Sequence, residues 1–409
     1  MKKTYMSNIF IMLGIVVGIA SGYMNNSFVF LAAGSIAELF VNFLKLISLP
    51  IVFLSITSTL SGMKSLDETK ILGKKVLKYT ISTTLIAATV ALILYVVIQP
   101  VRSHVAVESS VVSSVQQGSY ASYLLNIVPS NIVQAFSEGN VIGIAFISMI
   151  LGLAIVALPE DNRKFLHTLF SSLFSALLKI TSVVITLIPI GIWAFTVLFI
   201  KNMHEGSVHV KSLMLYIVCV VAANFIQGFI VLPLMLKWKG LSPTKIAKAV
   251  SPALIIAFFT KSSTAALPTA LQCSEKKLGV SRKVSTFSLP LCSVVNMNGC
   301  AAFILTTVLF VSMSHGVQYT AIEMGMWVII ATIAAIGNAG IPMGCYFLSS
   351  AFIAGMNLPL HIMGTILSVY TIIDMIETSL NVWSDICITS VVDKELKANK
   401  VRLMRNINY

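Results

Sequence analysis

Charged residues are scarce in this chain of 409 residues: Asp, Glu, Lys and Arg make up 11% of it, whereas 57% of its residues are hydrophobic. A soluble domain of this size needs a far more charged surface to stay in water. The mean hydropathy of +0.91 is instead typical of a protein that crosses the bilayer several times. We therefore expect an all-α polytopic membrane protein.

Motifs of the common enzyme and metal sites are also lacking. The sequence contains no P-loop lysine motif, no GxSxG elbow and no HExxH pair, and its six cysteines show no CxxC spacing. We expect the cysteines to be small apolar residues that form neither a disulfide framework nor a metal site. An intramembrane enzyme is a weak hypothesis, because no pairing of a nucleophile with a base is evident.

The basic residues, which give a formal net charge of +13, lie mostly between apolar segments. Segments that approach or exceed the length of a bilayer span occupy about residues 9–24, 32–61, 79–99, 141–157, 165–200, 212–236, 284–314 and 362–392. With the N-terminus inside, nearly all Lys and Arg residues become cytoplasmic, which is the positive-inside pattern and gives no reason to invoke nucleic acid. We expect both termini to be cytoplasmic, the first segment to be a span and not a cleaved signal peptide, and 100–140 to be an external loop.

Two further apolar regions are interrupted. At 246–275, AFFTKSSTAALPTALQC carries Lys261, Ser262 and Ser263 between cytoplasmic flanks, and at 324–356, AAIGNAGIPMGCYFLSSAF carries glycines and a proline between external flanks. Such breaks must be buried in protein or line a wet cavity. We expect two re-entrant helical hairpins that enter from opposite faces, an inverted-repeat arrangement. For the first region an ordinary span with a proline kink is the alternative, and it would reverse the topology downstream.

The last apolar segment contains DMIETSLNVWSD, residues 374–385, with three carboxylates. Each costs about 2.5–3.5 kcal/mol at mid-bilayer, so the three need partners, ligands or water. On a helix, one stripe about 100° wide and about 16 Å long holds the polar side chains Asp374, Glu377, Thr378, Asn381 and Asp385. This length accommodates a substrate and a cation side by side. The alternative is that the acids only form ion pairs with Lys45, Lys179 or Lys261.

With these segments assembled, the chain resembles the dicarboxylate/amino acid:cation symporter family, the glutamate transporter homologues. The resemblance covers nearly the whole chain and rests on LKLISLPIVFLSI (44–56), VPSNIVQAFSEGNVIGIAF (128–146), IPIGIWAF (188–195), FFTKSSTAALP (258–268), SLPLCSVVNMNGCA (288–301), GNAGIP (337–342) and DMIETSLNVWSD. It implies eight transmembrane helices plus two re-entrant hairpins, a homotrimer in membrane lipid, and transport by an elevator movement.

The resemblance also implies a division into domains. Residues 1–61 and 141–201 would form a scaffold, with helices 1, 2, 4 and 5. Residues 74–99 and 211–392 would form a mobile transport domain, with helices 3, 6, 7 and 8 and the hairpins at 246–275 and 324–356. Residues 393–409 would be a cytoplasmic tail.

Site residues follow from the same resemblance. Those implied for the substrate are Ser262, Ser263, Cys300, Gly340, Asp374, Glu377, Thr378 and Asn381, with Asp374 binding the ammonium and Asn381 helping to hold the α-carboxylate. Those implied for sodium are Asn296, Asn381 and Asp385. A second, deeper sodium site would use Tyr79, Ser82, Thr83 and Asn298. Taken alone, Asn296 and Asn298 are also explained as hydrogen bonds to a neighbouring helix.

Two positions depart from the family's pattern. Asn298 replaces the usual aspartate, so the deeper sodium site loses its own charge. Glu377 stands where carriers of acidic amino acids have an arginine, and a glutamate there would repel a second carboxylate. Lys261 and Met343 stand where arginine and glycine are common.

We expect sodium-coupled uptake of serine and threonine, as in the bacterial sodium/serine-threonine symporter branch, in a bacterial cytoplasmic membrane and without a cofactor. The alternatives for the substrate are another neutral, a cationic or an acidic amino acid, or a dicarboxylate, and the coupling ion could instead be a proton. An ion channel is the alternative from another class of protein.

Overall fold

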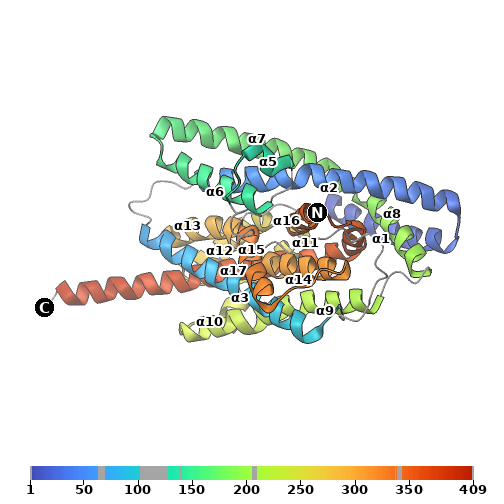
Figure 1. Cartoon of the computed structure of the whole chain (residues 1–409). Coiled ribbons are helices and arrows are strands. Elements are labelled where there is room, and N and C mark those ends of the chain that lie inside the picture. The colour runs from blue at the N-terminus through green and yellow to red at the C-terminus, as the bar shows by residue number, and fades with distance from the viewer. Residues whose placement is uncertain are drawn as a thin grey trace.

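The computed structural model describes residues 2–62, 70–101, 128–137, 141–204, 210–336, 338 and 343–407. Within these ranges every regular element is helical, as the composition predicts (Figure 1). The predicted external loop at 100–140 lies largely outside the described residues, apart from α5 (Ile132–Ser137) and its flanks.

One group of helices is built around α2. It consists of α1 (Lys2–Tyr23), α2 (Ser27–Ser61), α6 (Val141–Ala157), α7 (Glu160–Thr186) and α8 (Ile188–His204). α2 packs against α6, α7 and α8, and α1 packs along α8. Figure 1 shows α2, α6 and α7 together along one side of the molecule, with α5 beside α6.

The remaining helices surround α14 and α17. They are α3 (Lys70–Ile98), α9 (Val210–Ile226), a π-helical turn (Gln227–Val231), α10 (Leu232–Trp238), α11 (Pro243–Thr260), α12 (Ser263–Lys276), α13 (Arg282–Val295), α14 (Asn298–Ser314), α15 (Ala321–Ile336), α16 (Gly344–Gly355) and α17 (His361–Ile407). α14 is buried along nearly its whole length and contacts α3, α9, α15, α16 and α17. The polar stripe of α17 therefore faces other helices and not the outside of the bundle.

Both interrupted regions are broken where the sequence predicts. α11 ends at Thr260, and its C-cap Lys261 adopts a left-handed backbone conformation with φ of 53°. Ser262 then caps α12, its hydroxyl accepting from the Ala265 amide at 3.2 Å. α11 and α12 pack against each other. In the second region α15 and α16 both pack on α14, and Met343, with φ of 59°, precedes α16.

Two predicted single segments are divided in the structure. The segment at 165–200 becomes α7 and α8 because Pro189 has no amide hydrogen to continue the helical ladder past Leu187. The segment at 284–314 becomes α13 and α14, separated by Asn296 and Met297. Asparagine side chains compete with the backbone for hydrogen bonds, and here they are held by α17.

Within the described residues, four helical stretches are long and apolar enough to cross a membrane: Leu72–Ile98, Val210–Trp238, Arg282–Ser314 and His361–Ala398. Shorter apolar helices such as Met12–Tyr23, Phe146–Ala157 and Ile188–Lys201 lie in other predicted spans. Large apolar side chains are exposed on the outer faces, for example Phe28 at 75% and Trp238 at 91%. Such surfaces suit a lipid environment.

Close packing of α1 on α8 yields a prediction. A Cβ on Gly14 would lie 2.6 Å from the carbonyl oxygen of Pro189. Because a backbone atom cannot move by itself, Gly14→Ala should cost about 1–3 kcal/mol of stability and lower the midpoint of thermal unfolding in detergent. The control is Gly34→Ala on α2, where nothing lies within 4 Å and alanine favours the helix. Equal midpoints for the two variants would contradict this packing.

Candidate functional site

The three carboxylates of the α17 stripe are buried. Asp374 is 6%, Glu377 1% and Asp385 3% exposed. No ion pair among the described side chains involves any of them. Lys261 acts on Asp374 electrostatically without forming a salt bridge. Among the described residues, the stripe is therefore not explained by ion pairs alone.

A small cavity lies beside the first half of the stripe, with a volume of about 20 Å³. Its lining consists of Lys261, Ser263, Met297, Asn338, Cys345, Asp374, Glu377, Thr378 and Asn381. The lining thus comes from both interrupted regions, from the α13–α14 break and from α17. Segments far apart in the sequence meet here because the helix ends at each break lie at the cavity.

Three helices begin at this cavity. Ser263 opens α12, Met297 directly precedes α14, and Cys345 lies in the first turn of α16. The first amides of a helix have no partner within the helix and carry partial positive charge. Asp374 and Glu377 line the same cavity. A negative group fits the helix N-termini and a positive group fits the carboxylates, so the arrangement suits a small zwitterion.

Glu377 is buried without a donor in good hydrogen-bond geometry. Among the described residues no hydrogen bond meets either of its carboxylate oxygens; the Tyr370 hydroxyl is a neighbouring donor, and the nearby Asn224 side-chain oxygen also lacks a partner. Nearly all buried polar groups in proteins are hydrogen-bonded, so a cluster of buried oxygens without hydrogen bonds needs an explanation. A donor supplied by a ligand would satisfy Glu377.

A second polar group lies further along α17, around Asp385, about one turn beyond Asn381. The Asn296 amide donates to Asp385 Oδ1 at 2.8 Å, and the Thr83 hydroxyl donates to Asn296 Oδ1 at 3.3 Å. α13 ends at Val295 with Asn296 as its C-cap, and a helix C-terminus presents carbonyl oxygens without helical partners. A carboxylate with amide, hydroxyl and carbonyl oxygens is the donor set that a hard cation prefers.

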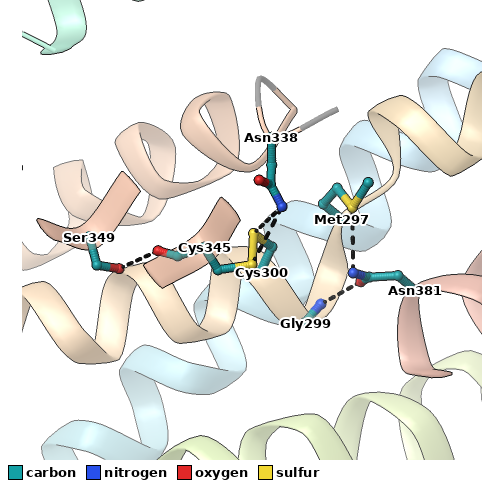
Figure 2. Close-up of a disulfide and its surroundings, with 7 residues drawn as sticks. All are labelled: Met297, Gly299, Cys300, Asn338, Cys345, Ser349 and Asn381. Carbon is teal, nitrogen blue, oxygen red and sulfur yellow. Dashed lines mark hydrogen bonds between the residues drawn. A yellow bond between two sulfur atoms is a disulfide. The ribbon is translucent and has the colours of Figure 1, made fainter. Parts of the chain in front are cut away.

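Asn381 connects this second group to the cavity. Its side-chain oxygen accepts from the Gly299 amide at 2.9 Å, and its amide donates to the sulfur of Met297 at 3.4 Å (Figure 2). Asn381 is thereby fixed at the N-terminus of α14, between the cavity and the Asp385 group.

Both ends of the Asn298 side chain are hydrogen-bonded within the protein. Its side-chain oxygen accepts from the Thr84 hydroxyl at 2.9 Å, and its amide donates to the Ser384 hydroxyl at 2.8 Å. It therefore joins α3, α14 and α17 without a charge. Thr84 and Ser384 were not predicted as site residues, although each is a polar residue next to a predicted one, Thr83 and Asp385.

Tyr79 and Ser82 lie elsewhere in this structure. Ser82 is exposed, and the Tyr79 hydroxyl donates to Glu395, which also pairs with Lys75 and with Lys239. Of the four residues predicted for a deeper sodium site, Thr83 and Asn298 are buried. The structure does not place Tyr79 and Ser82 beside them. Gly340, a predicted substrate residue, lies outside the described residues.

The expectation that the cysteines form no disulfide is wrong for one pair. Cys300 and Cys345 are joined by a disulfide across a sequence separation of 45 (Figure 2). The spacing gave no signal because the pairing depends on the packing of α16 against α14. Cys300 is therefore a covalent partner of Cys345, which lines the cavity. The cavity residues Met297 and Asn338, which were not predicted, depend on the same packing.

The sequence is similar to those of known transport proteins. Residues 8–395 match the Sodium:dicarboxylate symporter family. The Neutral amino acid transporter B(0) of Bos taurus is 29% identical over 384 residues, which cover 85% of this chain and 70% of that protein. The Neutral amino acid transporter A of Homo sapiens is 28% identical over 392 residues, which cover 85% and 73%.

The Asn298 cluster yields a second prediction. Thr84→Val keeps the shape of the side chain but leaves the buried Asn298 oxygen without its donor, so stability should fall by about 1–3 kcal/mol. The matched control on the same helix is Thr89→Val, because the Thr89 hydroxyl is exposed and bonds only to Leu85 of its own helix. Thermal unfolding in detergent measures both. A loss no larger in Thr84→Val than in Thr89→Val would rule out this role.

Proposed function

Because the chain belongs to the sodium:dicarboxylate symporter family, we propose that it takes up small neutral amino acids, serine and threonine first, together with sodium. The family and the relatives are transporters and not enzymes, and sodium is the co-transported cation. Sodium-coupled amino acid transport follows from the family and the relatives. The choice of serine and threonine rests on the cavity.

The unpartnered Glu377 is the observation that carries the proposal. A substrate ammonium placed at Asp374 leaves its α-carboxylate toward the N-termini of α12 and α14, near Ser263 and Asn381. A short hydroxylated side chain then faces Glu377, which accepts a hydrogen bond from the hydroxyl. An acidic side chain would instead be repelled at close range.

Sodium is assigned to the group formed by Asp385, Asn296 and Asn381, at the C-terminus of α13. We assign no second ion to Asn298, because it carries no charge and its side-chain oxygen already accepts from Thr84 while its amide donates to Ser384. A site without a carboxylate offers less to a cation. The proposal therefore has fewer sodium ions per amino acid than a carrier with an aspartate at this position.

The division into domains is proposed on the packing. Helices around α2 would form the scaffold of a homotrimer, and those around α14 and α17, with both interrupted regions re-entrant, would move as an elevator. We place the protein in a bacterial cytoplasmic membrane with both termini in the cytoplasm, because the basic residues accumulate between the spans on that side.

The decisive experiment is uptake into proteoliposomes with and without an inward sodium gradient, for a panel of amino acids. The proposal expects labelled serine to accumulate above its external concentration only with the gradient. Competition by alanine and lysine separates the alternatives, because a cationic substrate would pair with Glu377 and displace serine. Equilibration without accumulation would instead indicate a channel.

The cation assignment yields a third prediction. Asp385→Asn removes the only formal charge of the proposed sodium site but keeps its shape, so half-maximal serine uptake should need a much higher sodium concentration. Glu323→Gln on α15 is the control, because Glu323 is an acid outside the cavity that only caps its own helix. A wild-type sodium dependence in Asp385→Asn would place the cation elsewhere.

Glu377 yields the fourth prediction. Glu377→Arg puts a planar, always charged donor beside the substrate's side chain, so recognition should shift toward aspartate while serine uptake falls. Reversing a like-charge contact at an effective dielectric near 20 changes the interaction by on the order of a few kcal/mol, about a hundredfold in relative affinity. Competition of labelled serine binding by aspartate measures the shift.

A matched variant separates a change in substrate selectivity from a general loss of binding or folding. Glu377→Gln keeps the size and removes the charge, so it should weaken serine binding without creating a site for aspartate. Both variants are compared only after size-exclusion chromatography shows folded protein. If Glu377→Arg keeps the wild-type ratio of serine to aspartate affinity, Glu377 does not determine the selectivity for the substrate's side chain.

A further inference from the structure

The disulfide between Cys300 and Cys345 is part of the cavity wall. Cys300 lies in the first turn of α14 and Cys345 in the first turn of α16, and Cys345 itself lines the cavity. The Asn338 amide, also in the wall, donates to both sulfurs, at 3.1 Å to Cys300 and 3.5 Å to Cys345 (Figure 2). The sulfur pair thus joins two helix N-termini that face the proposed substrate position.

The cavity is too small for an amino acid. Its volume of about 20 Å³ holds about one water molecule. Serine is several times larger, so substrate enters only when parts of the wall separate. Asn338 closes the wall tightly on the α16 side, because its side-chain oxygen lies where a Cβ on Gly344 would be.

The disulfide opposes separation of α16 from α14. It holds the two Cα atoms 5.3 Å apart, and a disulfide permits Cα separations only up to about 6.8 Å. The other walls, formed by α12 and α17, carry no such covalent link in the described residues. One side of the cavity is therefore fixed by a bond that a reductant can break.

We infer that Cys300 and Cys345 form a redox modification site: the disulfide holds the cavity contracted, and reduction to two thiols lets α16 move away so that substrate can enter. The inference rests on the proposed function. Reduction breaks the S–S bond, and a dithiol supplies two electrons and two protons while it becomes a cyclic disulfide. In the reverse direction a small disulfide takes up the two electrons and two protons as it is reduced to thiols.

The transport test uses the full-length protein in proteoliposomes, treated with dithiothreitol or with oxidised glutathione. Alkylation followed by intact-mass measurement counts the thiols in each sample. The expected result is loss of most serine uptake in the oxidised sample, full recovery after reduction, and a gain of two alkylated thiols. Equal uptake in two samples whose thiol counts differ by two would overturn the inference, as would failure of the pair to form a disulfide.

Cysteine variants assign the effect. The ratio of reduced to oxidised uptake, taken for each protein against itself, should fall to one in Cys345→Ser and in Cys300→Ser. Cys219→Ser is the control and should keep the wild-type ratio, because Cys219 is a free buried cysteine on α9 whose thiol is near the Leu94 carbonyl. A ratio that persists in Cys345→Ser would assign the effect to another group and reject the pair.

A second readout does not depend on the substrate. Hydrogen exchange of amides in α16 reports local opening, and it should be faster in the reduced protein than in the oxidised one, with α7 unchanged. If neither sample transports any amino acid, the proposed function fails, while the exchange data still test whether the disulfide restrains α16. Identical exchange of α16 in the two redox states would overturn the redox inference by itself.

Discussion

A carboxylate that is buried among apolar helices must be neutralised or given donors, since the bilayer offers no water to solvate it. α17 carries Asp374, Glu377 and Asp385 on one face, and the surrounding helices are arranged around this requirement. Side chains supply few donors to these acids. Helix ends lie beside the stripe as well, because breaks in the chain bring the starts of α12, α14 and α16 and the end of α13 to it.

Whether a helix begins or ends at a break determines which ligand the adjacent site can bind. Near Asp374 and Glu377 the helix starts are positive, which creates a place with both signs of charge. Near Asp385 a helix ends, and its carbonyl oxygens add to the carboxylate. The α13–α14 break contributes to both places at once, since one helix ends where the next begins. A single interruption therefore makes one region suited to a zwitterion and an adjacent one suited to a cation.

The sequence predicted the parts of this arrangement that depend on local chemistry. The stripe follows from helical spacing in 374–385, and the break at Lys261 and Ser262 follows from polar residues in an apolar run. The break at Asn296 was not predicted, because the local pattern continues as a helix, whereas the two asparagines are held by side chains of α17 and α3 that are distant in the sequence. The disulfide and the placement of Tyr79 on Glu395 likewise depend on contacts between distant segments.

Coupling of cation and amino acid follows from the shared elements. Asn381 is held by Gly299 and Met297 at the start of α14, while Asp385, one turn further along α17, holds Asn296 at the end of α13. α17 is continuous through both positions, so their spacing along it is fixed. In the proposed function a cation bound at Asp385 and Asn296 would contact the α13–α14 break, and through it the elements that hold Asn381 and the α14 amides. The two proposed sites would therefore be coupled through this one break.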